Sequence, residues 1–140
     1  MGFVVMGIRN KFFIYTLACL GLMACSAAVE KKNEKWYQQK WCGQMGGEME
    51  VVLKDKTRCD CLVDGYAIEV DFSKKWAEAI GQSLHYAKMT NEEAGILLII
   101  ESPNDKRHLK RLEDTISYHS LPIRVWTTDE KEVTQSGLNR

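Results

Sequence analysis

The sequence predicts an α/β fold, a three-layer sandwich with a central mixed sheet in the core order αβββαβ followed by αβ. The pair Asp64-Gly65 separates two alternating apolar runs, which is typical of a β-hairpin. Five consecutive aliphatic residues at 96–100 suit a strand that is covered on both faces. Amphipathic helical stretches stand on both sides of that strand, and 140 residues leave room for one domain of this kind.

The first part of the domain is predicted to be a helix followed by a three-stranded meander. Residues 30–45 place their large apolar side chains near one helical face. The glycine pair at 46–47 tolerates the left-handed backbone that commonly ends a helix. A polar turn is expected at 54–57, within the meander. The strands of the meander are expected at 48–53, 58–63 and 66–72.

The second part is predicted to alternate helices with strands. Ser73 is a candidate N-cap for a helix over 74–89, whose apolar stripe includes Trp76 and Ile80. After the aliphatic strand at 96–100, the pattern predicts a helix over 104–118 and a short strand over 123–127. The expected organisation is a leader at 1–29, a folded domain at 30–128 and a polar C-terminal tail at 129–140.

The leader has the features of an export signal. Arg9 and Lys11 precede an uncharged apolar run at 12–29. Residues 22–25 resemble a bacterial lipobox, in which Cys25 is lipidated, attaches the chain to the membrane and becomes the mature N-terminus. The alternatives are ordinary cleavage after the small residues that follow, or a retained anchor at the lower length limit for spanning. We therefore expect an exported protein of the bacterial cell envelope, anchored as a lipoprotein.

Charge gives no general reason to expect nucleic acid as a partner. The whole chain has 19 basic and 19 acidic residues, and the leader contains two of the bases and no acid. The remainder therefore has 19 − 2 = 17 bases against 19 acids, a net charge of −2. A nearly neutral domain binds nucleic acid only through a local patch.

Three cysteines lie beyond the leader. Cys59 and Cys61 are alternate residues of one predicted strand, so both should face the same side and should not readily bridge each other. We expect buried thiols, because a free cysteine behaves as a small hydrophobic residue. One disulfide from Cys42 is the alternative for an exported protein.

The predicted hairpin brings acidic side chains together. With the turn at 64–65, Asp60 lies opposite Glu69, and such partners have Cβ atoms about 4.5–5.5 Å apart. Asp71 belongs to the same face, where Arg58 lies opposite it and could neutralise part of the charge. A divalent cation such as Mg²⁺ would also relieve the repulsion, since it prefers carboxylate oxygens. The alternative is a solvated polar face that carries acids by chance.

The following helix adds a second group of polar residues. Lys75, Gln82 and Tyr86 lie on one stripe that is distinct from the stripe of Trp76. Because this helix directly follows the strand that carries Glu69, its first turn should lie near the acids.

In this order, the acidic and helical motifs resemble those of the PD-(D/E)XK nucleases, in particular the RecB-like branch with its Gln-x-x-x-Tyr element. The motifs are Asp60, then Glu69-Val70-Asp71, then Gln82 to Tyr86. The core order of that family corresponds to residues 30–101. The resemblance implies a phosphodiester hydrolase that uses Mg²⁺ or Mn²⁺ and acts on nucleic acid, DNA more than RNA.

The resemblance also implies roles for single residues. Asp60 and Glu69 would bind the metal, with Glu50, or alternatively Glu48, as the first acid of the family pattern. Gln82 and Tyr86 would orient the substrate and the catalytic lysine.

The chain departs from the family at one catalytic position. Asp71 stands where the family has lysine, so we expect Lys75 to supply the missing charge, with Lys74 in reserve. If neither lysine reaches the acids, the alternative is an inactive envelope lipoprotein that uses the nuclease-like fold for binding.

One basic run remains outside these motifs. It consists of Lys106, Arg107, Lys110 and Arg111 in the predicted helix 104–118. We interpret it as the solvated face of an amphipathic helix, with a nucleic-acid patch as the alternative.

Overall fold

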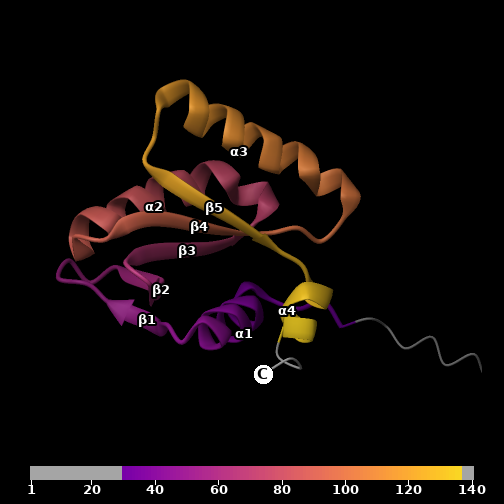
Figure 1. The fold of residues 1–140 in the computed structure, drawn as a ribbon, viewed down its shortest axis with the longest axis horizontal. Coiled ribbons are helices and arrows are strands. Elements are labelled where there is room, and N and C mark those ends of the chain that lie inside the picture. Colours follow the sequence, from indigo (N-terminus) through magenta and orange to yellow (C-terminus); the bar gives the residue numbers. More distant parts are fainter. Residues whose placement is uncertain (1–29, 137–140) are drawn as a thin grey trace, which may run out of the picture. The chain divides into compact units, whose positions relative to one another are not determined.

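A five-stranded mixed sheet forms the middle layer of the fold (Figure 1). The computed structural model describes residues 30–136, and its sheet has the strand order β1-β2-β3-β4-β5. The first three strands pair antiparallel, whereas β4 and β5 continue the sheet in parallel with β3. The strands are β1 (Glu48–Val52), β2 (Arg58–Val63), β3 (Tyr66–Phe72), β4 (Glu93–Ile99) and β5 (Ile123–Thr128).

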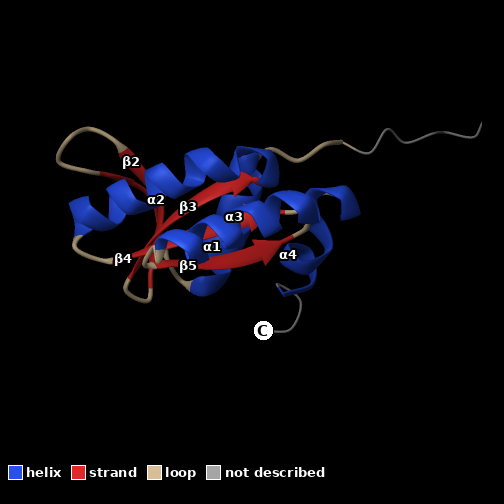
Figure 2. Cartoon of the chain, turned by 90° about the horizontal axis from the view of Figure 1, so that it is seen from above, coloured by secondary structure: helices blue, strands red, loops and turns tan. Residues whose placement is uncertain are grey.

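Helices cover both faces of this sheet. On one face, α1 (Glu34–Met45) and α4 (Glu130–Ser136) pack on side chains of β2, β3 and β4. On the other face lie α2 (Trp76–Thr90), which runs alongside β3 in Figure 2, and α3 (Lys106–His119). The predicted three-layer α/β sandwich with a mixed sheet is therefore confirmed.

Strand β4 is buried on both faces, as its aliphatic run predicts. Leu97 and Ile99 pack in the core beneath α1, while Ile96 and Leu98 pack beneath α2 and α3. The strand begins at Glu93, earlier than the expected 96, because its backbone continues to pair with the start of β3.

The hairpin between β2 and β3 has the predicted turn. Asp64 and Gly65 both have left-handed backbones, with φ of 51° and 81°. Both strands have their predicted bounds, and Cys61 lies opposite Ile68 as the turn requires. This hairpin supplies the acidic residues of the candidate site.

The helix starts differ from the sequence expectations. Asn33 caps α1, since its side chain accepts a hydrogen bond from the backbone N–H of Trp36 at 2.9 Å, so the helix begins later than residue 30. Ser73 does not cap α2 and is instead buried in the 3-10 turn η1 (Ser73–Lys75). A second such turn, η2 (Pro103–Asp105), precedes α3.

The segment expected to be a polar tail begins with a packed helix. Val133 of α4 is 2% exposed, and its carbonyl accepts a hydrogen bond of 2.6 Å from the Gln44 side chain of α1. The folded part therefore extends past residue 128 to at least Ser136. A single buried apolar residue in a polar segment gives no helical periodicity, so tertiary contacts determine this helix.

Residues 1–29, including the lipobox and Cys25, lie outside the described residues. Within 30–136, no helix has the length and apolar character that crossing a membrane requires.

A disulfide joins Cys42 of α1 to Cys61 of β2, with a Cα–Cα distance of 6.0 Å. The expectation of free thiols is wrong for this pair, and the alternative of a bridge from Cys42 is correct. Only Cys59 is a buried free thiol among the described residues. Gly47 leaves room for the bridge, because a Cβ there would lie 2.7 and 2.8 Å from the two sulfurs.

The expectation that Cys59 and Cys61 face the same side is also wrong. Cys61 belongs to the core beneath α1, whereas Cys59 packs with Tyr86 of α2. The side-chain alternation of β2 is interrupted between them, at Asp60. There the Asp60 carboxylate accepts a hydrogen bond from the Val70 N–H at 2.9 Å, and its carbonyl accepts one from the Gln38 side chain at 2.7 Å.

Candidate functional site

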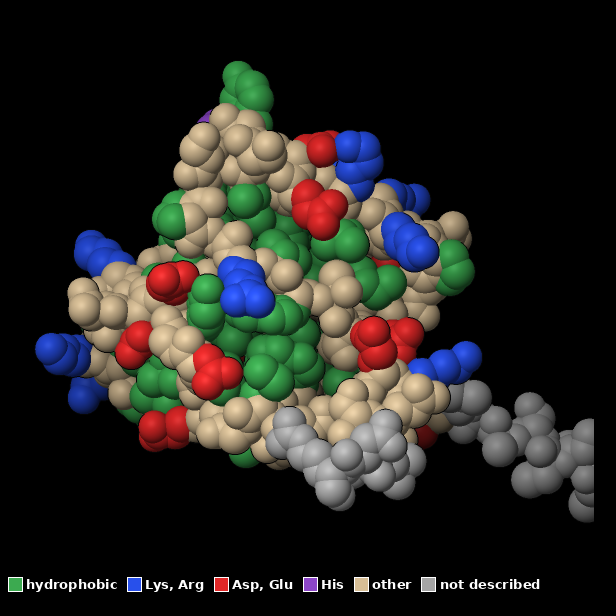
Figure 3. Space-filling model, in the orientation of Figure 1, with side chains coloured by type: hydrophobic (Ala, Val, Ile, Leu, Met, Phe, Trp, Pro, Cys, Tyr) green, Lys and Arg blue, Asp and Glu red, His purple; other side chains and the backbone are tan. Residues whose placement is uncertain are grey.

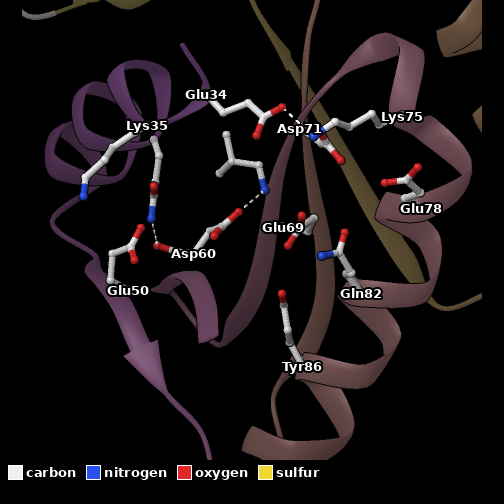
Figure 4. Close-up of a pocket in the computed structure, with 12 residues that line it drawn as sticks. Glu34, Lys35, Glu50, Asp60, Glu69, Asp71, Lys75, Glu78, Gln82 and Tyr86 are labelled. Carbon is white, nitrogen blue, oxygen red and sulfur yellow. Dashed lines mark hydrogen bonds and ion pairs between the residues drawn. The ribbon is translucent and has the colours of Figure 1, made fainter. Parts of the chain in front are cut away.

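A polar pocket of about 330 Å³ lies between α1, α2 and the first three strands (Figure 4). All seven residues that the sequence analysis proposed for the site line this pocket. They are Glu50, Asp60, Glu69, Asp71, Lys75, Gln82 and Tyr86. The reserve candidates Lys74 and Glu48 are exposed and do not line it.

Asp60 lies at the point where β2 departs from β3. The backbone pairing of these strands ends at Cys61 and Ile68, so Asp60 and Glu69 are pocket neighbours rather than a paired rung of the sheet. Burial raises the pKa of Asp60 to about 6, and the negative charge of Glu50 adds to this effect. The hydrogen bond from Val70 opposes it, because it stabilises the charged form.

Glu69 is the most strongly perturbed acid of the pocket. Its side chain is almost excluded from water, 5% exposed, and its Oε2 has no hydrogen-bond partner. Burial raises the pKa of Glu69 to about 9, with further contributions from the charges of Asp60 and Asp71. The hydroxyl of Tyr86 points toward this carboxyl in Figure 4 and lowers its pKa slightly. At neutral pH, Glu69 therefore retains a proton unless another cation replaces it.

The side chain of Lys75 reaches the acidic cluster. Lys75 Nζ lies 3.2 Å from Asp71 Oδ1 and 2.8 Å from Glu34 Oε1. Asp71 is 2% exposed, and burial together with hydrogen bonding to Glu34 raises its pKa to about 7. The Glu34 hydrogen bond also raises the pKa of Lys75, so this side chain is positively charged across the physiological range.

Arg58 does not neutralise Asp71, contrary to the sequence expectation. It pairs instead with Glu50 on β1, at 2.9 Å. The reason is the β1–β2 pairing, which places Arg58 opposite Val52 and turns it toward the outer strand. Glu50 itself has a left-handed backbone, with φ of 57°, and the hydrogen bond from Arg58 lowers its pKa.

Two pocket residues on α1 were missed by the sequence analysis. Glu34 contacts Lys75, and Gln38, which is 4% exposed, holds the carbonyl of Asp60. These residues lie four apart and share one helical face. That polar spacing was a usable signal, but nothing in the sequence says that α1 lies over the acids.

The donor atoms of the pocket fit a hard divalent cation. The unpartnered Oε2 of Glu69 and the neighbouring Asp60 carboxyl group are oxygen donors in a pocket lined by more acids than bases. Within residues 30–136, no group of three or more His, Cys, Asp or Glu side chains is assembled to hold a metal ion. Mg²⁺ retains several waters and commonly binds through one or two carboxylates, so Asp60 and Glu69 are the residues that could hold it.

Comparison with known proteins gives one weak similarity. The chain is 29% identical over 92 residues to the putative KilA-N domain-containing protein L33 of Acanthamoeba polyphaga mimivirus. The match covers 65% of this chain and 37% of the relative, so the chain spans little more than a third of that protein. No family model and no solved structure matches the chain.

Proposed function

We propose that this protein is a metal-dependent nuclease of the PD-(D/E)XK type that hydrolyses phosphodiester bonds of DNA. The buried Glu69 carboxyl, with its unpartnered oxygen beside Asp60, is the observation that carries the proposal. A buried carboxyl oxygen without a hydrogen-bond partner does not stabilise the fold, which supports a functional role for Glu69. The presence of Lys75 at the same pocket supports a site for phosphate chemistry.

The residues have distinct roles in this proposal. Asp60 and Glu69 would hold Mg²⁺ or Mn²⁺, which when bound lowers the pKa of a coordinated water and neutralises phosphate charge. Lys75 stabilises the negative charge that develops on the phosphate oxygens, and Asp71 and Glu34 hold it in position. Gln82, exposed on α2 at the rim of the pocket, donates to the substrate.

The charge of the pocket explains why the reaction would require a cation. Six acids and two lysines line the pocket, so a phosphate is repelled until some of the negative charge is removed.

The similarity to a KilA-N domain-containing protein is compatible with a DNA-related function.

A cleavage assay tests the proposal directly. Plasmid DNA, linear DNA and RNA are incubated with the full chain in Mg²⁺, in Mn²⁺ or in EDTA. We expect cleavage only with a metal, and its loss in Glu69→Gln, which keeps the shape of the side chain but removes its charge. Glu92→Gln is the matched control, because Glu92 is exposed and lies outside the pocket. Cleavage that survives in Glu69→Gln would refute the assigned site.

A second candidate is a non-catalytic binding protein with the same fold. The observation that favours it is the position of Lys75 between two carboxylates, Glu34 and Asp71, which reduces the positive charge available to a phosphate. The binding function replaces the nuclease function if the wild-type protein binds Mg²⁺ in calorimetry, or binds DNA, without cleaving any substrate.

We further propose that the chain is exported and attached to the envelope through Cys25. The Cys42–Cys61 disulfide supports export, since such bonds persist in oxidising compartments and are rare in the cytosol. Intact-mass analysis of the protein expressed in bacteria tests it. A product that retains its whole leader would contradict the proposal without affecting the nuclease assignment.

A further inference from the structure

The first half of α3 presents a basic surface that the pocket does not use. Its four bases are all exposed and follow the outward side of the helix. They are Lys106, Arg107, Lys110 and Arg111. Figure 3 shows Lys and Arg side chains gathered where Figure 1 places the start of α3. We call this set the α3 basic surface.

Most of this positive charge is not neutralised within the described residues. Lys110 is paired with Asp114 at 2.8 Å, one helical turn further on. Lys106, Arg107 and Arg111 form no ion pair in the part of the chain that the structure describes. The acids of α3, Glu113 and Asp114, lie in the middle of the helix, after the basic residues. This charge separation leaves the start of α3 positive in a domain whose net charge is about neutral.

Topology places the α3 basic surface at the same edge of the sheet as the pocket. Each of α2 and α3 follows a parallel strand and so begins at the carboxyl end of the sheet (Figure 1). Helix α3 also packs against η1, the turn that carries exposed Lys74 and the pocket residue Lys75. In open α/β sheets, ligands bind outside the carboxyl ends of the strands.

We propose that the α3 basic surface, continued by Lys74, binds the phosphodiester backbone of the nucleic acid whose scissile phosphate enters the pocket. The inference rests on the proposed function in taking nucleic acid as the ligand. It also explains how nucleic acid could reach the pocket, since an acidic pocket in a nearly neutral domain does not attract a polyanion by itself. Positive charge beside the pocket supplies that attraction and leaves the pocket itself to the cation.

The test measures binding separately from cleavage. Affinity of the full chain for a fluorescein-labelled 20-base-pair DNA duplex is measured by anisotropy at several salt concentrations, in EDTA so that no metal-dependent cleavage occurs. The variant is Lys106→Gln/Arg111→Gln, since neither side chain forms an ion pair or hydrogen bond with another of residues 30–136. The control, Lys40→Gln/Lys54→Gln, removes the same charge from exposed positions on α1 and in the β1–β2 turn.

We expect the α3 variant to bind the duplex about tenfold more weakly or worse, and the slope of log K against log salt to fall by about 2. The control should keep the wild-type affinity and slope. Mg²⁺ binding measured by calorimetry should be unchanged in both variants. An equal loss in the two variants would show a general charge effect and overturn the proposal.

Two further measurements separate the alternatives. If the α3 variant loses binding to anionic phospholipid vesicles but not to the duplex, the surface contacts a membrane and the proposal is wrong. A labelled RNA of the same sequence, run in parallel, distinguishes the two sources of the phosphodiester backbone. Failure of the nuclease proposal is visible independently, as absence of cleavage with every metal while duplex binding still depends on α3.

Discussion

The two faces of β3 are equally buried but chemically opposite. Ile68 and Val70 are 0% and 3% exposed and pack in the core beneath α1. Glu69 and Asp71, the alternate residues, are 5% and 2% exposed and line the pocket beside α2. On one face, β3 therefore buries apolar side chains, which stabilises the fold. On the other face it buries ionisable side chains, which lowers stability.

This contrast separates residues that stabilise the fold from residues that serve the site. Burying a large aliphatic side chain contributes roughly 1.5–3 kcal/mol. Burying a carboxyl group disfavours its charged form, which is why the pKa of Glu69 is raised to about 9. Side chains with equal exposure therefore make opposite contributions to stability, and exposure alone does not reveal which ones are functional.

The largest effect is expected when a side chain is removed from the apolar face of β3. Ile68→Ala should lower the free energy of unfolding by about 2–5 kcal/mol, because it leaves a cavity in a fully buried site. Glu69→Gln serves as the comparison and should be neutral or stabilising at pH 8 without metal. Urea denaturation followed by circular dichroism measures both. A cost below about 1 kcal/mol for Ile68→Ala would contradict its assignment to the core.

On the pocket side, Lys75→Ala tests function rather than stability. It should reduce metal-dependent cleavage by about 10²–10³-fold, as loss of a preorganised electrostatic group commonly does. At saturating DNA, Lys74→Ala should retain the cleavage rate, because Lys74 is exposed outside the pocket and its proposed role is in binding the DNA backbone. Single-turnover rates on linear DNA are the measurement. Equal rates in Lys75→Ala and wild type would remove Lys75 from the mechanism.

The disulfide attaches α1 to the sheet, and α1 contributes residues both to the apolar core and to the pocket. Tyr37 packs in the apolar core, whereas Glu34 and Gln38 line the pocket. Replacing Cys42 and Cys61 by alanine should lower stability by about 3 kcal/mol, given a sequence separation of 19.

Thermal or urea unfolding under oxidising conditions measures this loss. Cys59→Ala is the control, since it removes a buried thiol without breaking a cross-link. If the control costs as much as the double variant, packing rather than the cross-link accounts for the effect.

The last expected effect is a dependence of stability on pH in the absence of metal. The folded protein keeps the Glu69 proton up to about pH 9, whereas the unfolded chain releases it near the ordinary glutamate pKa of 4.5. The native state therefore binds more protons in this window, and stability should fall as the pH rises from about 4.5 to about 9.

The slope from this one proton is at most about 1.4 kcal/mol per pH unit. Melting temperatures measured in EDTA between pH 6 and pH 9 test it against Glu69→Gln, which should show a shallower decline. Identical profiles would mean that Glu69 ionises normally.

Most of the fold and much of the site could be predicted because they depend on local patterns. The turn at 64–65 fixed the bounds of β2 and β3, and with them the common placement of Asp60 and Glu69. The helical stripe expected over 74–89 predicted that Lys75 and Tyr86 lie on one side, and both line the pocket, Lys75 from η1 and Tyr86 from α2. These inferences needed only the turn type and the helical repeat.

The errors come from contacts between segments distant in the sequence. Glu34 was missed because its role depends on α1 lying over the pocket. Helix α4 was missed because Val133 is its sole buried residue. The side-chain alternation of β2 is interrupted at Asp60, whose carboxylate accepts a hydrogen bond from the Val70 N–H. The alternating sequence pattern of a strand does not predict such a contact.

The Cys42–Cys61 bond also determines what a protease can release. The exposed β1–β2 turn, with Lys54 and Lys56, lies inside the ring that this bond closes. A trypsin-like cut in the turn would leave Glu34 and Glu50 on one fragment and Asp60 and Glu69 on the other. The two fragments would stay covalently joined until a reductant reached the bridge, so a nicked molecule would keep every acid of the pocket.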